Sequence, residues 1–406
     1  MKKIMFAFLL ICNSLCYYSV ASQYLHPSDI RISLLTVDPG QKFYSVFGHT
    51  AIRVSIDSSN YSVAEHTAIR TFFSEYDIVY NYAMFTFSSD LYFNWLRGRM
   101  VFQMSKEMYD IFMTKCVREK RSVREQVLEM DSTQIMFIIR SLEHDYNPKN
   151  RYYRYMFFDD NCTTRIRDLI LQAYDNVTLP KSHGALTYRG QIHPYLKQYP
   201  WRKFIIDIVS GLSLDLEIDI YKQMFLADNI NDIFARTLSH GQPIVKETIN
   251  IFDNGQSVVQ SSCLITPAVV CFFFLALSFL LSIFERYRRF SLFFDFFIFL
   301  IVGIIGVLIT YFWFFSDHTT DLADNLNIIW ALPTHFVVAF FLLFKRHFIF
   351  IHKYFLITAI ISAFLIASWI FLPQRLNPAL IPLVLAIVLR SWCIYSRSYP
   401  NNFKEM

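Results

Sequence analysis

The sequence has few charged residues for its length. Of its 406 residues, 17% are charged, whereas a soluble globular protein has about 25%. Its 38 basic and 33 acidic residues leave a formal net charge of only +5. They form no basic stripe, and there is no aromatic RNA-binding motif, so we expect no nucleic-acid partner. The 7 cysteines include no zinc-like pair, and no His/Cys/Asp cluster has ligand spacing, so we predict no metal and no other cofactor.

Apolar residues are abundant instead, and they are unevenly distributed. The chain is 54% hydrophobic and contains 42 Phe. Residues 22–250 have an ordinary globular composition, whereas Phe, Leu and Ile dominate 263–396. Five apolar runs there are long enough, or nearly so, to cross about 30 Å of hydrocarbon: 263–284, 291–315, 328–344, 348–372 and 377–396. We therefore predict an all-α domain of five transmembrane helices at 262–396, with a short third helix.

Charges between these runs predict the orientation of the chain. Basic residues lie at 286–289, at 345–347 and at Lys404, whereas the loops at 316–325 and 373–378 carry acids or a single Arg. Positively charged loops face the cytoplasm. We therefore expect residues 22–255 outside the cytoplasm and the tail, 397–406, inside, which requires an odd number of spans.

The first 21 residues have the pattern of a secretory signal peptide. Two lysines precede an apolar core, and Ser19-Val20-Ala21 provides a cleavage signal with small residues. An uncleaved membrane anchor is the alternative interpretation. Either way, the segment that follows is exported.

The exported segment, 22–255, has the pattern of an α+β fold. Alternating residues predict strands at 30–37, 49–56, 77–87, from 103 and at 125–130, and helical spacing predicts helices at 89–97, 132–145 and from 162, with more helix in 201–250. We expect a small antiparallel sheet with helices, joined to the membrane domain by residues 250–260.

Cys162 lies where a reactive thiol is expected. Asp160 and Asn161 are favoured helix N-cap residues, and an apolar stripe at helical spacing follows them. Amides and the helix dipole favour a thiolate on the first turn of a helix and lower the pKa of a cysteine there. A disulfide with Cys116, the other cysteine of the exported segment, is the alternative.

His49 opens a predicted strand, which would hold its imidazole rigidly. Gly48 before it permits close approach of another backbone. A lone histidine at such a position more often belongs to the surface than to a catalytic site. We therefore consider His49 and Cys162 together.

A series of motifs carries a family resemblance. They are F-G-H-T-A-I-R-V at 47–54, Y-N-Y at 80–82, L-R-G-R at 96–99, N-P-K-N-R-Y-Y-R-Y at 147–155, D-N-C-T-T-R-I-R-D at 160–168, T-Y-R at 187–189, G-L-S-L-D at 211–215, M-F-L-A-D at 224–228, and D-H-T-T…N-L-N-I-I-W-A-L-P at 317–333. In this order they resemble the lipoprotein N-acyltransferases found in Bacteroidota. The family has proline where this chain has Ala227, which we interpret as a change in a loop.

The resemblance implies a fold and a site. The exported domain of that family resembles a permuted papain-like fold, related to lecithin:retinol acyltransferase-like proteins, in which the histidine strand precedes the cysteine helix. It implies Cys162 as nucleophile and His49 as general base and acid. A third group usually orients the base, and the next strand offers Asp77 and Asn81. Asn81 fits better, because tyrosines flank it on a strand expected beside that of His49.

Further candidates concern lipid contact. Arg165 and Arg167 have the geometry to hold a phosphate, although pairing with Asp168 on an exposed helix face is the alternative. Tyr82 and Trp330 are also candidates for lipid binding, Trp330 within an outer loop that we expect to line a lipid entrance. An ordinary aromatic belt is the alternative for Trp330.

Together these features predict a function. We expect a multi-pass protein of the bacterial inner membrane that moves an acyl chain from a phospholipid, through a thioester on Cys162, to the α-amine of a diacylglyceryl-cysteine lipoprotein. The resemblance implies both substrates. One alternative is a membrane-anchored cysteine amidase or peptidase acting on cell-wall peptides. Another is a non-catalytic assembly factor in which Cys116 and Cys162 are bridged.

Overall fold

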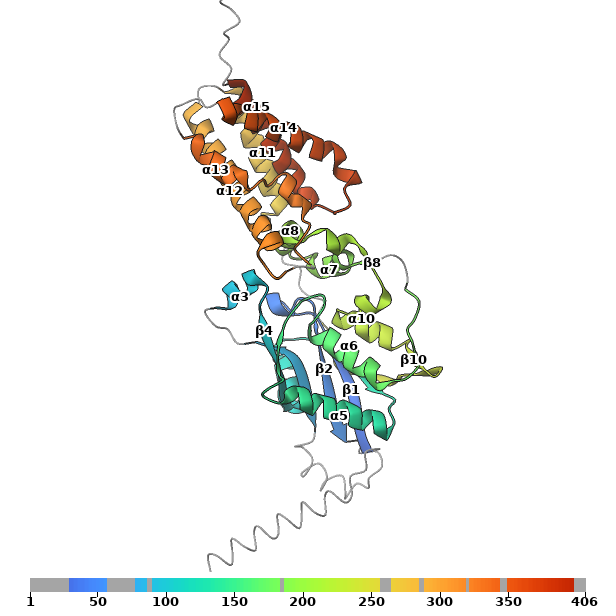
Figure 1. Cartoon of the computed structure of the whole chain (residues 1–406). Coiled ribbons are helices and arrows are strands. Elements are labelled where there is room, and N and C mark those ends of the chain that lie inside the picture. The colour runs from blue at the N-terminus through green and yellow to red at the C-terminus, as the bar shows by residue number, and fades with distance from the viewer. Residues whose placement is uncertain are drawn as a thin grey trace, which may run out of the picture. The chain divides into compact units, whose positions relative to one another are not determined.

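The computed structural model describes residues 29–56, 77–85, 90–182, 186–255, 264–284, 288–318, 321–343 and 349–397 (Figure 1). The predicted signal peptide, part of the predicted joint and nearly all of the tail lie outside these residues. The chain divides into two compact units, described separately below. A head unit comprises Met1–Thr86, Val101–Ser182 and Ile220–Gln256, and a membrane unit comprises Phe87–Met100, His183–Asp219 and Ser257–Met406.

The head unit is built on an antiparallel sheet. Over the described residues it has seven strands, in the spatial order β12 (Val245–Phe252), β5 (Val123–Leu128), β1 (Ile30–Val37), β2 (His49–Ile56), β3 (Ile78–Met84), β4 (Val101–Met108) and β6 (Tyr152–Arg154). The predicted strand at 30–37 is β1, and the other predicted strands lie within a few residues of their predicted bounds. The α+β class is therefore confirmed for this unit.

Strand β12 corrects one expectation. We predicted more helix in 201–250, and α8 (Pro200–Val209), α9 (Ile220–Gln223) and α10 (Ala227–Phe234) lie there, but the chain then enters a strand at Val245 that pairs with β5 at the edge of the sheet. Ile249 and Ile251 alternate with polar residues, and this period of two is the spacing of a strand with one covered face. The prediction of helix in this range is therefore confirmed, but it did not include this strand.

Helices cover both faces of the head sheet. Helix α4 (Tyr109–Arg118) packs Phe112 and Cys116 into an apolar cluster that contains Ala51 of β2. Successive side chains of a strand point to opposite faces, so Thr50 points to the other face, where its hydroxyl bonds Thr163 of α6 (Cys162–Ala173). Helices α5 (Ser132–Tyr146) and α10 (Ala227–Phe234) pack with α6 there (Figure 1).

Ala227 also differs from expectation. We expected a loop at this position, but Ala227 is buried as the first residue of α10. Proline is favoured at the first position of a helix, because its missing N–H would have no partner there in any case. The proline that the resemblance implies at this position would therefore be compatible with the same helix start.

The membrane unit contains apolar helices at each of the predicted spans. They are α11 (Pro267–Ile283), α12 (Arg288–Phe314), α13 (Thr334–Phe341), α14 (Ile349–Ser368) and α15 (Ile381–Arg397). By length and composition, 3 helices in the described part of the chain are able to cross a membrane: Arg289–Phe314, Ile349–Phe371 and Pro378–Ser396. Pro267–Ile283 and Leu326–Phe341 are apolar but shorter. The structure thus supports three candidate spans, and the count of five stays a prediction.

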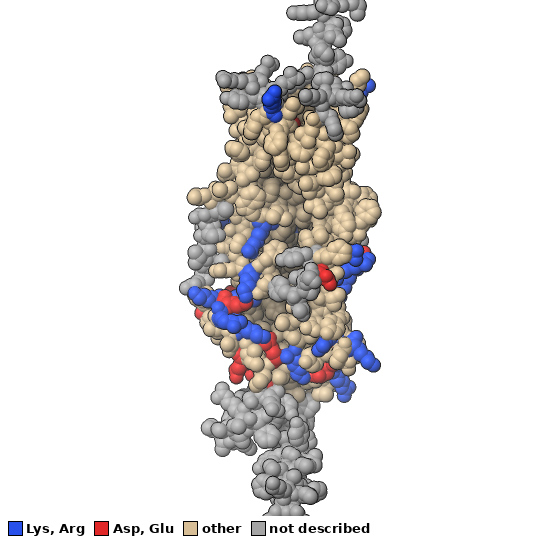
Figure 2. All heavy atoms as spheres, turned by 90° about the vertical axis from the view of Figure 1, so that its left-hand side faces the viewer, with Lys and Arg blue, Asp and Glu red and all other residues tan. Residues whose placement is uncertain are grey.

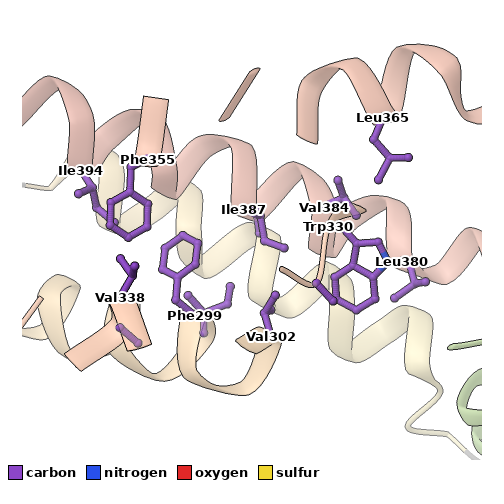
Figure 3. Packing of buried hydrophobic residues seen from close by; sticks show 14 of the residues in the cluster. Phe299, Val302, Trp330, Val338, Phe355, Leu365, Leu380, Val384, Ile387 and Ile394 are labelled. Carbon is purple, nitrogen blue, oxygen red and sulfur yellow. The ribbon is translucent and has the colours of Figure 1, made fainter. Parts of the chain in front are cut away.

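Trp330 requires a correction. We expected it to contact lipid in an outer loop, but its side chain has no exposed surface and lies in the apolar core of the membrane unit (Figure 3). Its indole N–H donates to Asn327 Oδ1 at 2.9 Å. The ring therefore obtains inside the protein the apolar contact and the hydrogen-bond acceptor that a membrane interface would otherwise supply.

Glycines in α12 allow close backbone packing beneath Trp330. A Cβ atom added at Gly306 would lie 2.0 Å from the carbonyl oxygen of Ala331, and one at Gly303 would lie 2.1 Å from the amide nitrogen of Phe336. Neither contact is possible for a side chain. Small residues at these positions bring the main chain of α12 directly against the segment that leads into α13.

Buried polar side chains join the segment 183–219 to the loops between the membrane helices. Asp207, in α8 (Pro200–Val209), accepts hydrogen bonds from Arg189 (2.8 Å), His193 (2.8 Å) and Asn377 (2.9 Å). Gln374 donates to the carbonyl of Ser210 at 2.8 Å. We predicted one boundary near residues 255–262. In the structure residues of the segment 186–219 group with the membrane unit, and the predicted boundary stays a prediction.

A second buried polar cluster lies among the membrane helices themselves. Arg390 of α15 pairs with Asp295 of α12 through contacts of 2.6 and 2.8 Å, and both side chains are almost completely buried. Ser291 and Ser282 accept further bonds from the guanidinium. Each buried charge thus has hydrogen-bonding partners that offset the desolvation cost of burial in an apolar surrounding.

Candidate active site

Cys162 is the first residue of α6. As predicted, an N-cap residue precedes it: the Asn161 side chain accepts from the amides of Thr163 (2.7 Å) and Thr164 (2.9 Å). The Thr164 hydroxyl in turn accepts from the Asn161 amide at 2.8 Å, which completes a capping box. Cys162 as a residue is partly buried. The sequence around Cys162 therefore produces a well-formed helix start with the sulfur on its first turn.

His49 is the first residue of β2, and Gly48 before it has φ +80°. A Cβ at Gly48 would lie 3.0 Å from the carbonyl oxygen of Val37 and 3.1 Å from Ala227 Cβ. Only glycine adopts this conformation without strain in so little space. Gly48 thus sets the direction in which the chain enters the strand, and with it the position of the imidazole.

Adjacent residues hold the strand against the helix. Thr50 follows His49 and Thr163 follows Cys162, and their hydroxyls lie 3.0 Å apart in a fully buried contact. The sequence-based prediction missed both threonines. Only their position in the sequence, next to the two candidate residues, could have suggested them. This bond fixes the separation between the imidazole and the thiol.

Asn81 orients the imidazole. Its Oδ1 lies 2.9 Å from His49 Nε2, and its Nδ2 donates to Glu107 at 3.1 Å. An amide oxygen only accepts hydrogen bonds, so Nε2 carries a proton and Nδ1 is the nitrogen left for the thiol. Asp77, the other candidate, is paired with Arg53 at 2.7 Å. The geometry therefore brings Asn81 to His49, whereas Asp77 belongs to a separate ion pair.

The two reacting groups shift one another's pKa. Burial would raise the pKa of the Cys162 thiol, but the attraction of His49 and hydrogen bonds from His49, the Thr50 amide and Thr163 lower it to about 7. Burial would lower the pKa of His49, but its interaction with Cys162 and its bond to Asn81 raise it above its ordinary value. Both shifts favour a thiolate–imidazolium pair, which is the form in which cysteine is nucleophilic.

Aromatic side chains lie beside the start of α6. On the side of the capping loop, Phe157 lies 4.8 Å from Phe47 and 5.8 Å from Phe225, measured between ring centroids. Asn161 donates to the carbonyls of Phe157 and Phe225, so these residues are held directly beside the start of α6. Aromatic residues therefore lie close to the first turn of α6, which carries the thiol.

A second aromatic series reaches the site from the sheet. Phe102 stacks on Tyr155 at 4.1 Å and on Phe85 at 5.1 Å, and Tyr44 meets the edge of Phe85 at 5.8 Å. Burial and the negative charge on Cys162 raise the pKa of Tyr155, which places this ring near the sulfur. The series ends at exposed Tyr44, so contacts between aromatic rings connect Tyr155 to the surface of the head unit.

The two arginines of α6 are already occupied. Arg165 forms a bidentate pair with Asp160 (2.5 and 2.8 Å) and lies over the ring of Tyr153. Arg167 bonds Asp168 at 2.6 Å, as the alternative interpretation proposed, and lies over Tyr221. Both guanidinium groups thus have carboxylate and aromatic partners within the head unit.

Tyr82 is buried, and its contacts differ from the lipid binding that we expected. Its hydroxyl donates to Asp145 Oδ2 at 2.7 Å, on α5. Together with Arg165 and residues of α5 and α6 it lines an open cleft of about 1130 Å³ on the head unit, and Cys162 is not part of that lining. Tyr82 therefore joins β3 to α5 rather than lying at the thiol.

Cys116 and Cys162 are both free thiols. Cys116 is buried in the cluster under α4, and this burial raises the pKa of its thiol to about 11. It is therefore protonated and unreactive at neutral pH. In this structure the two cysteines belong to different environments, one inert and one activated, and they form no bridge.

The head unit thus has a cysteine–histidine–asparagine site, and the chain also has apolar helices able to span a membrane, which defines a membrane-anchored protein with a thiol-based candidate active site. A family model described as the Lnb N-terminal periplasmic domain matches residues 17–193, and one described as the Lnb transmembrane domain matches residues 259–402. The chain therefore belongs to the Lnb-type lipoprotein N-acyltransferase family and has a periplasmic N-terminal domain. A search of curated proteins and a search of solved structures found no match.

Proposed function

We propose that this protein is a lipoprotein N-acyltransferase in which Cys162 carries the acyl chain as a thioester. The observation that supports this most strongly is the lowered pKa of Cys162, to about 7, in contact with His49. His49 is held in turn by Asn81. Nucleophile, base and orienting group thus form one connected chain, which is the arrangement that covalent catalysis requires. The proposed fold is the permuted papain-like one.

In the first half-reaction the Cys162 thiolate attacks the carbonyl carbon of a phospholipid ester. A carbon–sulfur bond forms, the carbon–oxygen bond to glycerol breaks, and the His49 imidazolium gives its Nδ1 proton to the leaving oxygen. The products are the acyl-enzyme and a lysophospholipid. The amides of Thr163 and Thr164 are capped by Asn161. The Cys162 amide, the first of α6, is therefore the group we assign to the oxyanion.

In the second half-reaction the α-amine of a diacylglyceryl-cysteine attacks the thioester. The carbon–sulfur bond breaks, a carbon–nitrogen bond forms, and neutral His49 takes the proton that the amine loses, which restores the starting pair. The aromatic residues around the site, among them Phe47, Phe157 and Phe102, support acyl-chain substrates and limit access of water to the thioester.

The presence of a membrane domain is consistent with substrates that reside in a bilayer. We propose an inner-membrane location with the C-terminus in the cytoplasm, five spans, a phospholipid donor and a diacylated lipoprotein acceptor. A peptidase acting on cell-wall peptides would need an anchor but no aromatic surroundings for its thiol. The amidase alternative therefore has less support from the site.

Complementation tests this function. The full chain would be expressed in a strain that lacks its own lipoprotein N-acylation, and lipoprotein N-termini would be analysed by mass spectrometry. The wild type and Cys116→Ser should restore triacylated lipoproteins, whereas Cys162→Ser should not. A well-inserted wild-type protein that leaves the lipoproteins diacylated would contradict the proposal.

A further inference from the structure

Two short helices of the membrane unit expose large apolar side chains to solvent. Helix α3 (Leu91–Arg97) exposes Phe93 (52%) and Trp95 (38%), and α8 exposes Trp201 (37%) and Ile205 (56%). Soluble surfaces seldom gather aromatic residues in this way. Both helices lie in segments that group with the membrane helices. We call these four residues, with Phe314 and Phe315 at the end of α12, the apolar collar.

Helix α3 is fixed to the end of α12. The amide of Asp317 donates to the carbonyl of Arg97 at 2.9 Å, and His318 Nε2 donates to the carbonyl of Trp95 at 2.7 Å. The Trp95 ring meets the edge of Phe312 at 5.8 Å. These bonds hold the C-terminal turn of α3 and leave the ring of Phe93 outside. The collar continues at Phe314 and Phe315, which are 65% and 73% exposed.

Helix α8 is fixed at the same end of the membrane unit. The Trp201 indole donates to the carbonyl of Ile265 at 2.7 Å, directly before α11. Helices α11 and α12 are consecutive and joined by a short connection, so the start of α11 lies at the same end as the finish of α12 (Figure 1). Two tryptophans thus mark one level of the bundle, as they do where membrane proteins meet the headgroup layer.

Arg97 stands out among the charges at this level. Its guanidinium lies over the ring of Phe93, 3.9 Å from the ring centroid, and no carboxylate of the described residues pairs with it. Its neighbour Arg99 is paired with Asp317 at 2.7 Å. A guanidinium stacked on an aromatic ring keeps its N–H edge available, and that edge matches a phosphate in a bidentate manner.

We propose that the apolar collar lies in the headgroup layer of the phospholipid bilayer and that Arg97 binds a lipid phosphate there. Figure 2 shows a broad surface with few charged side chains, and many large apolar side chains of the membrane helices are exposed, so the collar lies at one end of helices already adapted to lipid. Short amphipathic helices bind membranes when an apolar face is buried next to basic side chains that meet anionic groups. This inference does not depend on acyl transfer.

Bromolipid quenching tests the location of the collar. The full-length protein would be placed in nanodiscs whose phospholipids carry bromine near either the headgroup or the end of the acyl chain. The fluorescence that Trp95→Phe removes is the contribution of Trp95. We expect it to be quenched strongly by the shallow bromine and weakly by the deep one. A contribution that neither lipid quenches would overturn the proposal.

Photocrosslinking tests the role of Arg97. A phospholipid with a diazirine in its headgroup, incorporated in the same nanodiscs, should label the peptide that contains α3. Arg97→Ala should lower this labelling about tenfold, as loss of a charge-assisted phosphate contact predicts, and Arg97→Lys should lower it less. Arg140→Ala, an exposed arginine of α5, should match the wild type. Equal labelling of Arg97→Ala and the wild type would refute a phosphate site at Arg97.

Discussion

His49 Nε2 lies 2.9 Å from Asn81 Oδ1, although 32 positions separate the two residues. The antiparallel pairing of β2 with β3, in which Ile52 faces Tyr80, brings them together. The bond holds one tautomer of the imidazole and leaves the other nitrogen for the thiol. Asn81 is therefore a positioning residue in the proposed reaction.

Replacement of Asn81 should slow catalysis without unfolding the protein. Asn81→Ala frees the imidazole to rotate, and we expect kcat to fall about 10- to 100-fold, with KM for the phospholipid little changed. Ser105→Ala is the matched control, because Ser105 faces Asn81 on β4 and its hydroxyl has no hydrogen-bond partner among the described residues. Steady-state transfer rates in detergent–lipid micelles measure both. A similar fall in kcat in the two variants would mean that disturbance of the paired strands, and not loss of the Asn81 amide, slows the reaction.

Alkylation by iodoacetamide should report the pKa of Cys162. A lowered pKa means that thiolate accumulates as pH rises through the shifted value, so the rate should have its midpoint near pH 7. Cys116, with a pKa of about 11, should remain slow throughout the neutral range. In His49→Ala the midpoint should move upward, because the attraction to the imidazolium is lost. Peptide mass spectrometry follows each cysteine, and a wild-type midpoint that His49→Ala leaves unmoved would rule out the pair.

The parts of the site that sequence predicted have strong local patterns. The cap at Asn161 and the glycine before His49 are motifs of neighbouring residues, and strand β1 has a clear alternation. The threonine contact between Thr50 and Thr163 was not predictable, because it depends on how two elements pack in space. Asn81 was preferred to Asp77 because tyrosines flank it on the strand expected beside that of His49, and the ion pair of Asp77 with Arg53 could not be read from the sequence.

Burial was the main feature that the sequence could not supply. Trp330 has the pattern of an interface residue, yet close packing at the glycines of α12 draws its segment into the core. The grouping of residues 183–219 with the membrane helices rests on hydrogen bonds across more than a hundred positions, such as Asp207 with Asn377. Local periodicity contains no information on such contacts.

Asp207 should be a stabilising residue of the membrane unit. Burial would raise its pKa, but bonds and charges from His193 and Arg189 lower it below the ordinary value. Its contribution is therefore present above the unfolded-state pKa and is lost as pH falls through the lower folded-state pKa. Asp207→Ala should cost about 2–3 kcal/mol at neutral pH, since Arg189 keeps Asp215 as a partner. Denaturant unfolding in detergent measures the free energy of unfolding, and Glu217→Ala, at an exposed position, is the control. Equal stability of the two variants would refute a stabilising role for Asp207.

The buried pair Asp295–Arg390 should show strong coupling. Either single alanine substitution leaves a charge without its partner in an apolar surrounding, and each should destabilise by about 3–5 kcal/mol. The double substitution removes both charges and should cost less than the sum of the singles by at least 1 kcal/mol. A double-mutant cycle, measured by unfolding in detergent, tests this. Additive effects would show that the two side chains act independently.

The proposed thioester is tested most directly by trapping it. The purified protein would be mixed with a phospholipid that carries a labelled acyl chain, without an acceptor, and the peptide that contains Cys162 would be analysed by mass spectrometry. We predict one labelled acyl group on Cys162, removed when a diacylglyceryl-cysteine peptide is added and absent from Cys162→Ala. Transfer of label to the acceptor by Cys162→Ala would contradict a covalent role for this sulfur.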